Sequence, residues 1–308
     1  MPPSRPTIAL CIPAYNAAGH LHRLLDSVEL QTEPFDEVFL YDDASTDGTA
    51  DVARARGVAV VRGDANVGAS VGKNRLAELV MSDWVHFHDA DDALGPEFVA
   101  RAREAIAQRN ADVVLFGTED REDGSGASLH IRRWDRAAIE QDAVRYCIVH
   151  TVTNCGVYRR AAFVSAGGFD TNPATRYNED QAMHVRMALS GLRFTAVDYV
   201  GYIVYRRRGS MSSGNQLACA RAQYEVLAGA AAATDRRYAT EIGARLWRLA
   251  GVLGAYGDWD YVRRCLEWAD RLGYTDPLGE HFVMRLLARV SPFGAVRARE
   301  ALIRATKP

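Results

Sequence analysis

Short apolar runs alternate with amphipathic stretches along the first third of the chain. The apolar runs have the length and turn-bounded composition of buried strands, and they lie at residues 7–12, 38–41, 58–61, 84–88 and 113–116. The stretches between them carry apolar residues at helical spacing, which predicts helices at about residues 21–28, 48–56, 68–81 and 97–109. This alternation predicts an α/β fold with a doubly wound, mostly parallel sheet and helices on both faces.

A different pattern begins after about residue 214. Residues 216–290 predict successive helices, in which Leu246, Leu249, Ala250 and Leu253 recur at helical spacing and form a core. Five arginines follow on either side of Pro292, at positions 285, 289, 297, 299 and 304. This basic segment is either an amphipathic element that lies on an anionic membrane surface or a docked terminal helix.

Acidic and polar residues follow three of the predicted strands. Asp89, Asp91 and Asp92 come directly after the strand at 84–88, Asp43 follows the second strand, and residues 13–16 (Pro-Ala-Tyr-Asn) follow the first. Open α/β sheets bind ligands at the carboxyl ends of their strands. Carboxylates there suit Mg²⁺ or Mn²⁺, which commonly bridges protein to phosphates. The pattern therefore predicts a metal-bound nucleotide diphosphate, although short acidic turns in other proteins are often merely solvated.

Composition and absent motifs exclude several classes of protein. The net charge of −2 over 308 residues argues against a nucleic-acid-binding protein. Neither a Gly-x-Gly-x-x-Gly after the first strand nor a P-loop is present. There is no run of eighteen apolar residues, and the first residues do not resemble a signal peptide. Five scattered cysteines without a Cys-x-x-Cys pair suit reduced thiols in a cytoplasmic protein.

Several motifs in fixed order resemble those of a known family. They are residues 13–16, 42–49, 66–68 leading to Lys73, 89–92, 168–170 and 178–180. In order, spacing and strand context they resemble a family 2 glycosyltransferase with the GT-A fold, over about residues 7–213. The resemblance implies a nucleotide-binding half at about 1–100, an acceptor-binding half at about 101–214, and a separate helical region at 215–308.

The resemblance also implies roles for the donor site. Asp43 would accept the imide hydrogen of uracil, a charge-assisted bond, with a turn or cap residue as the alternative. Tyr15 would lie beside the base or else simply pack in the fold, and Pro13 would make a backbone contact. Asp91 would be the main metal ligand, and Asp89 would reach the ribose or the metal. Asp92 is interpreted as a turn residue.

A lysine and an acidic pair carry the remaining implied roles. Only Lys73 and Lys307 are lysines among the 37 basic residues, and Lys73 is either a diphosphate contact or a helix-surface residue. The resemblance makes Asp180 the base that deprotonates the acceptor hydroxyl, with Glu179 able to exchange roles with it and a helix N-cap as the alternative. The corresponding loop of the family often carries a histidine that is sometimes a metal ligand, and this chain has no histidine at 206–208. The three arginines there either contact the diphosphate or are solvated.

These features together predict an inverting, metal-dependent hexosyltransferase. Its donor would be a UDP-sugar, and its acceptor a saccharide or lipid-linked saccharide of a cell-surface polysaccharide, at the cytoplasmic face of the membrane. The processive-synthase signature is missing, which favours single transfer. Two alternatives are a non-catalytic nucleotide-sugar binding module and a nucleotidylyltransferase, although residues 13–20 lack the glycine-rich phosphate loop of the latter.

Overall fold

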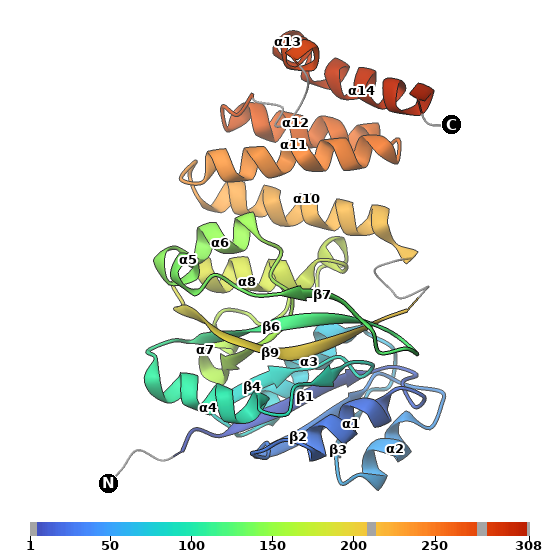
Figure 1. The fold of residues 1–308 in the computed structure, drawn as a ribbon, viewed down its shortest axis with the longest axis vertical. Coiled ribbons are helices and arrows are strands. Elements are labelled where there is room, and N and C mark those ends of the chain that lie inside the picture. Colours follow the sequence, from blue (N-terminus) through green and yellow to red (C-terminus); the bar gives the residue numbers. More distant parts are fainter. Residues whose placement is uncertain (1–4, 208–213, 276–281, 307–308) are drawn as a thin grey trace. The chain divides into compact units, whose positions relative to one another are not determined.

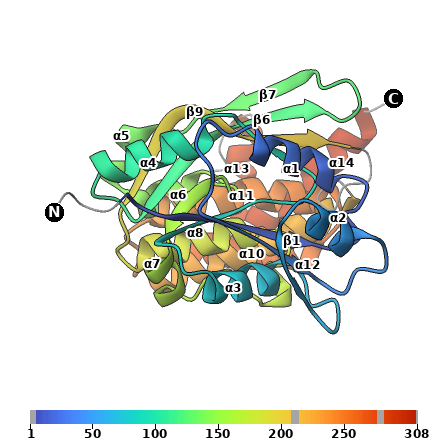
Figure 2. The same cartoon turned by 90° about the horizontal axis from the view of Figure 1, so that it is seen from below.

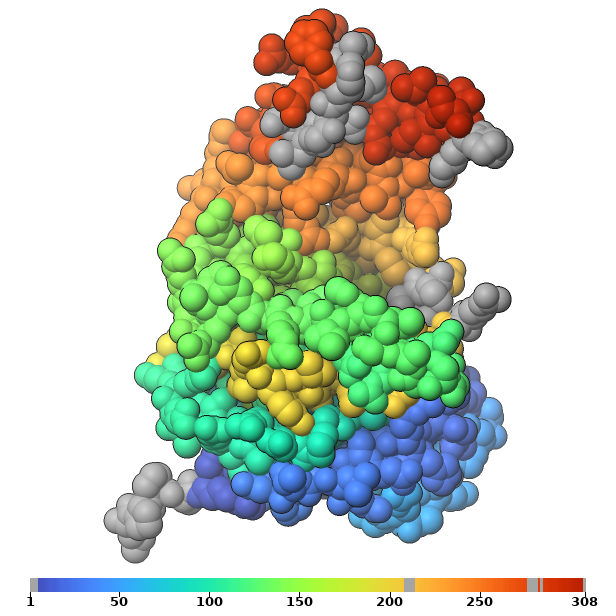
Figure 3. Space-filling view, viewed as in Figure 1, coloured from blue at the N-terminus to red at the C-terminus, as the bar shows by residue number. Residues whose placement is uncertain are grey.

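The structure of the chain, a computed structural model, describes residues 5–207, 214–275 and 282–306 (Figures 1 and 3). Contacts between residues divide the chain into two compact units. The first unit holds residues 1–143, 152–171 and 186–210, and the second holds residues 144–151, 172–185 and 211–308. Two segments within the first 214 residues therefore belong with the C-terminal helices.

A nine-stranded sheet forms the first unit, in the order β3-β2-β1-β4-β8-β6-β9-β5, with β7 paired to β6. Its strands are β1 (Ile8–Ala14), β2 (Glu37–Asp42), β3 (Ala59–Arg62), β4 (Trp84–Phe87), β5 (Ala93–Leu94), β6 (Val113–Glu122), β7 (Ser128–Arg132), β8 (Gly156–Arg159) and β9 (Phe194–Arg206). The strands β1 to β4 are parallel, as the alternation predicts. Beyond β4 the sheet is mixed, because β8 runs antiparallel to both β4 and β6. The expected α/β fold is confirmed, but the second half of the sheet is less parallel than expected. There β6 pairs with β9 in parallel, whereas β6 continues into β7 through a hairpin rather than a helical crossover.

The two faces of the sheet are covered by different helices. The core on one face joins β1 to α1 (Leu21–Glu29), α2 (Thr49–Ala55) and α4 (Phe98–Gln108). On the other face lie α3 (Ala69–Leu79) and α7 (Arg160–Ser165), as Figure 2 shows. All seven residues of β1 are buried, which suits its place inside the sheet. The short helix α5 (Arg136–Gln141) contacts β9.

A glycine lets α3 approach the sheet closely. The ring of Tyr41 on β2 is buried beneath α3. A Cβ atom at Gly72 would lie 2.6 Å from Cδ1 of this ring, so a larger residue would push the helix away. The close approach matters for function because the next residue in α3 is Lys73.

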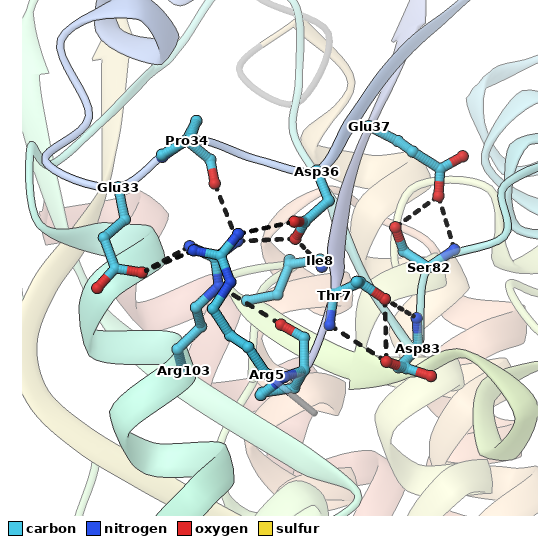
Figure 4. Close-up of polar contacts among 11 residues, drawn as sticks. Arg5, Thr7, Ile8, Glu33, Pro34, Asp36, Glu37, Ser82, Asp83 and Arg103 are labelled. Atoms are coloured by element: carbon cyan, nitrogen blue, oxygen red, sulfur yellow. Dashed lines mark hydrogen bonds and ion pairs between the residues drawn. The ribbon is translucent and has the colours of Figure 1, made fainter. Parts of the chain in front are cut away.

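Ion pairs around a buried arginine hold the amino-terminal ends of the strands together (Figure 4). Arg103 of α4 donates to Glu33 at 2.6 Å and to Asp36 at 2.7 Å, and also to the carbonyl oxygen of Pro34. The Asp36 carboxylate also accepts the N–H of Ile8 at the start of β1. Burial raises the pKa of Asp36, but the hydrogen bonds from Ile8 and Arg103 outweigh it and hold that pKa below its usual range.

The second unit is helical. It contains α6 (Ala143–Val149), the 3₁₀ turn η1 (Pro173–Thr175), the start of α8 (Glu179–Leu189), α10 (Gln216–Ala233), α11 (Ala239–Ala255), α12 (Trp259–Arg271), α13 (Phe282–Val290) and α14 (Pro292–Thr306). The predicted core residues Leu246, Leu249, Ala250 and Leu253 are all buried on α11. Arg245 of α11 donates to the carbonyl oxygens of Ile148 and Val149 at 2.9 Å, which fastens α6 to the helices. Within residues 5–207, 214–275 and 282–306, no helix is both long and apolar enough to cross a membrane.

The last helix is docked, as one of the two alternatives for the basic segment predicts. Pro292 occupies the first turn of α14, where its missing N–H is not needed. Ala295, Val296 and Glu300 of this helix are buried, and α14 packs against α11 and α12. The residues after Ser291 therefore contribute to the core of the second unit.

Replacing Arg103 by methionine is expected to lower the free energy of unfolding at pH 7 by about 1.5–3 kcal/mol, because Asp36 loses a charged hydrogen-bond partner. It keeps Arg5 at 2.9 Å and the N–H of Ile8. A depressed carboxyl pKa stabilises the fold above the unfolded value of about 4, and this contribution disappears as the pH falls through the folded value. The difference between wild type and Arg103→Met should therefore shrink below about pH 4. Urea denaturation at several pH values measures it.

The matched control is Arg101→Met on the same helix, whose ion pairs with Glu97 and Glu104 are exposed. Such pairs contribute about 1 kcal/mol or less. Equal effects of the two substitutions would mean that Arg103 is no structural anchor.

Candidate active site

The loops that follow β1 and β2 are bound to each other at the carboxyl edge of the sheet. The backbone N–H of Asn16 donates to the Ser45 hydroxyl at 2.9 Å, and the Asn16 side chain accepts the N–H of Thr46 at 2.8 Å. Pro13 is buried within β1, whereas half of the Tyr15 side-chain surface is exposed. The structure thus leaves the Tyr15 ring accessible for stacking rather than packed in the core.

Asp43 organises the loop that leads into α3. Its carboxylate is buried, and its two oxygens accept the backbone N–H groups of Val67 and Gly68, each at 2.8 Å. This structural role was not anticipated from the sequence. Each carboxylate oxygen has a further lone pair, so the same group can still accept a hydrogen bond from a ligand.

Lys73 is a buried cation, not a helix-surface residue. Only 2 % of its surface is exposed, and its Nζ lies 3.2 Å from Oδ1 of Asp89 and 4.8 Å from the centre of the Phe169 ring. A buried ammonium is costly unless it is paired, so this arrangement fixes a positive charge beside the acidic turn. In the sequence, Lys73 stands out because lysine is so rare in this chain.

Asn74, the next residue of α3, fixes the segment at 168–170. Its side-chain oxygen accepts the N–H of Phe169 at 2.8 Å, and its amide nitrogen donates to the Phe169 carbonyl at 2.9 Å. Gly168 has φ +62°, and a Cβ atom there would lie 2.4 Å from the Asn74 oxygen, so only glycine fits. Two motifs far apart in the sequence are therefore joined by one side chain.

Three carboxylates crowd the turn after β4. Asp92 is buried and accepts the backbone N–H of Tyr205 at 2.9 Å. Burial, with the charges of Asp91 and Asp89, raises the pKa of Asp92 well above its ordinary value. Burial also raises the pKa of Asp91, and Asp89 adds to this shift, while Arg207 opposes it. Asp92 is thus buried and bonded to β9, and is not a simple turn residue. The negative charge of the three carboxylates favours binding of a cation beside them.

Arginines supply part of that positive charge. Arg207 donates to Oδ2 of Asp91 at 2.6 Å, and Arg23 of α1 donates to the main-chain oxygen of Asp91 at 3.2 Å. Arg206 pairs with Asp120 instead, at 2.9 Å. The expected solvated basic run therefore makes specific ion pairs at 206 and 207, while Arg208 lies outside the described residues.

The remaining oxygens of Asp89 and Asp91 suit a divalent cation. Hard cations take oxygen ligands, and Mg²⁺ in particular is commonly held by one or two carboxylates, substrate phosphates and water. Over the described parts of the chain, no group of three or more acidic, histidine or cysteine side chains is arranged to hold a metal. A cation at this turn would thus depend on the donor's phosphates to complete its ligands.

Two buried histidines, His86 and His88, lie directly before the acidic turn. His86 bonds the carbonyl oxygen of Gly156 at 2.8 Å through Nδ1 and His88 at 2.9 Å through Nε2. Burial lowers the pKa of His86 to about 4, so the ring is neutral at pH 7. His88 stacks on Tyr202, whose hydroxyl accepts the backbone N–H of Asp89 at 3.1 Å. The histidines position the acidic turn.

Glu179 and Asp180 belong to the second unit, in the first turn of α8. Asp180 therefore lies inside the helix rather than at its N-cap. The Gln181 side chain donates to the carbonyl oxygen of Cys147 at 3.1 Å and accepts from Asn178 at 2.9 Å, which fixes the start of this helix. The assignment of Asp180 as the base remains a prediction.

Known proteins resemble this chain in sequence. Residues 9–166 match the family model for glycosyl transferase family 2. The chain is 28% identical over 250 residues to the succinoglycan biosynthesis protein ExoU of Rhizobium meliloti, covering 74% of this chain and 71% of that protein. It is 30% identical over 118 residues to the putative teichuronic acid biosynthesis glycosyltransferase TuaG of Bacillus subtilis, covering 37% of this chain and 47% of TuaG.

Solved structures resemble it in fold. Residues 1–349 of Staphylococcus aureus TarS, in complex with UDP-GlcNAc, match with a TM-score of 0.73 at 20% identity, over 98% of this chain and 92% of that one. The mannosyltransferase PcManGT from Pyrobaculum calidifontis, in complex with GDP-Man and Mn²⁺, matches with a TM-score of 0.60 at 18% identity, over 97% and 85%. These likenesses confirm the expected GT-A fold with a C-terminal helical region.

Substituting Asp43 by alanine is expected to lower the free energy of unfolding by about 1.5–3 kcal/mol, because two backbone N–H groups lose a charged acceptor. Nucleotide affinity should fall with it. Denaturation and calorimetric UDP binding measure the two effects. The matched control is Asp64→Ala, an exposed carboxylate in the loop between β3 and α3, to which Asp43 bonds. Undiminished UDP affinity in Asp43→Ala would limit Asp43 to its structural role.

Proposed function

The chain belongs to glycosyl transferase family 2, and from this premise we propose that it moves a sugar from a UDP-sugar to a saccharide acceptor with inversion at the anomeric carbon. As a glycosyltransferase it is an enzyme, which sets aside both the nucleotidylyltransferase and the non-catalytic binding module. The observation that carries the proposal is the acidic turn after β4, where Asp89 and Asp91 meet the cations of Lys73 and Arg207.

The donor site combines an acceptor for the base with charges for the diphosphate. Asp43 would take the imide hydrogen of uracil, with the exposed Tyr15 ring stacked on the base and the backbone at Pro13 beside it. The Lys73 ammonium acts as a point charge for phosphate oxygens. The UDP-GlcNAc bound to TarS supports a UDP-sugar as donor, although at 20% identity it does not identify the sugar.

A divalent cation would be held by Asp91, with Asp89 as a second ligand. When bound, Mn²⁺ or Mg²⁺ neutralises charge on the departing diphosphate. Burial, and next the charge of Asp89, raise the pKa of Asp91, and a cation bound between the two carboxylates would favour their charged forms. The Mn²⁺ complex of PcManGT is a further support.

Proton transfer is assigned to Asp180. The acceptor hydroxyl must lose its proton as it attacks the anomeric carbon, and a carboxylate within hydrogen-bond reach can accept it. Direct attack with inversion requires no covalent intermediate. Glu179, its neighbour in the first turn of α8, is the alternative base.

The acceptor class follows from the relatives. ExoU is named for succinoglycan biosynthesis and TuaG for teichuronic acid biosynthesis, which supports a saccharide or lipid-linked saccharide of a surface polysaccharide. We place the enzyme in the cytoplasm, at the membrane face where lipid-linked acceptors are extended. The scattered cysteines, without paired spacing, suit that reducing compartment.

Replacing Asp91 by asparagine should reduce turnover on the order of 100- to 1000-fold, a loss typical of removing one charge-stabilising group, while the protein stays folded. EDTA should abolish wild-type turnover, and Mn²⁺ should restore it. Release of UDP in the presence of an acceptor measures both. The matched control is Asp120→Asn, which removes a carboxylate paired with Arg206. An active Asp91→Asn enzyme, or full wild-type activity in EDTA, would refute the metal assignment.

Replacing Asp180 by asparagine keeps the shape of the side chain but removes the proton acceptor. The rate constant for transfer should fall roughly 100- to 10,000-fold, whereas calorimetry should find UDP affinity nearly unchanged. Glu179→Gln is the matched control and should have a much smaller effect. The reverse result, a large loss only in Glu179→Gln, would assign the base to Glu179.

A further inference from the structure

An apolar stripe on α13 faces solvent. Phe282, Leu286 and Val290 are 75%, 54% and 84% exposed. They are spaced four residues apart, so their side chains lie on one face of the helix. Ala288 lies about 120° or more around the helix from these three residues, at 3.6 residues per turn. It is buried, so α13 turns this small residue inward and Phe282, Leu286 and Val290 outward.

Two arginines border this stripe. Arg285 and Arg289 are exposed and are themselves spaced four apart, one position before Leu286 and Val290. Helix α13 contains no acidic residue, and neither guanidinium forms an ion pair with any described residue. We call the side chains of Phe282, Arg285, Leu286, Arg289 and Val290 the α13 face. Atoms of α13 lie at the molecular surface in Figure 3.

The arginines of α14 differ, because the fold already uses them. Arg297 stacks over the Trp259 ring at 5.6 Å, Arg299 pairs with Glu300 at 2.7 Å, and Arg304 donates to the carbonyl oxygen of Ala255 at 3.2 Å. Arg297 and Arg304 are exposed and keep their charge, but on α13 the exposed arginines also border an exposed apolar stripe.

We propose that the α13 face binds the surface of an anionic lipid membrane. A helix with an apolar stripe beside a cationic row can lie in the membrane interface, with its apolar residues among the acyl chains and its arginines at the headgroups. Arginine and lysine near an anionic leaflet are attracted to it. Two arginines and three apolar side chains make a weak, reversible contact, which lets the enzyme leave and rebind.

A second copy of the chain is a poorer occupant for this face. A symmetric dimer places the same patch on both subunits, so the unpaired Arg285 and Arg289 would meet their own like charges. Stable interfaces also use about 20–30 residues a side, far more than the α13 face provides. An anionic headgroup layer has the charge opposite to that of Arg285 and Arg289. Weak binding to it does not need an interface of 20–30 residues.

This inference names the surface through which the proposed membrane location would be reached, and in that respect it rests on the proposed function. Its test is independent of sugar transfer, because membrane binding needs neither donor nor acceptor. The full chain is mixed with vesicles of phosphatidylcholine alone or with phosphatidylglycerol, and the sedimented fraction is measured. Binding is expected only to the anionic vesicles and should weaken as salt is raised. The double variant Arg285→Gln, Arg289→Gln should bind roughly 25-fold more weakly, at about five-fold for each charge removed.

A second double variant, Leu286→Glu with Val290→Glu, should abolish sedimentation. Its matched control is Leu30→Glu with Met81→Glu, which changes two equally exposed apolar residues of the first unit and should bind as wild type. Circular dichroism and transfer to a soluble acceptor should be unchanged in the arginine variant, which replaces only exposed side chains.

Three outcomes would overturn the proposal. The first is failure of the wild-type protein to sediment with anionic vesicles at low salt. The second is a loss of binding in the control pair as large as that in the α13 variants. The third is a wild-type dimer, detected by light scattering, that the α13 variants convert to a monomer; the face is then an interface between copies of the chain.

Discussion

Mutual repulsion among Asp89, Asp91 and Asp92 is the constraint on which the rest of the site depends. Three carboxylates in four residues cannot share the end of one strand unless positive charge or hydrogen-bond donors are brought to them. The first unit supplies both: Lys73 beside Asp89, Arg207 beside Asp91, and a backbone N–H for Asp92. The groups that balance the three carboxylates come from distant parts of the sequence. The site therefore forms only when the sheet is complete.

The packing of the sheet delivers those groups. Gly72 allows α3 to approach Tyr41, which brings the next residue, Lys73, to the turn. Pairing of β9 with β6 carries the backbone at Tyr205 and the side chain of Arg207 to the same place. At the opposite ends of the strands, Arg103 ties α4 to the loop before β2. The ion pairs of Arg103 thus lie at the amino-terminal ends of the strands, and the three carboxylates lie at the carboxyl ends.

The parts predicted correctly from the sequence are those set by local pattern. Strands β1 to β4 and their helices follow from apolar periodicity, because each parallel crossover leaves its own strand–helix signal. The antiparallel place of β8 depends on pairing with strands more than 40 residues away, and no local pattern encodes it. Burial of Lys73 depends on the approach of α3 and on the Phe169 ring. The basic C-terminal segment was identified, but which of its arginines stay unpaired depends on how α14 docks.

Lys73 has one more consequence, which concerns covalent chemistry. Nearly all the positive charge of the chain is carried by guanidinium groups, and Lys73 is the only lysine among the described residues. Acylating enzymes and amine-directed reagents therefore find one ε-amino group there, and it lies buried against Asp89. Acetylation at this position would remove the positive charge beside Asp89, so the reactivity of the Lys73 amine, measured separately from that of Lys307, becomes a measure of whether the turn is intact.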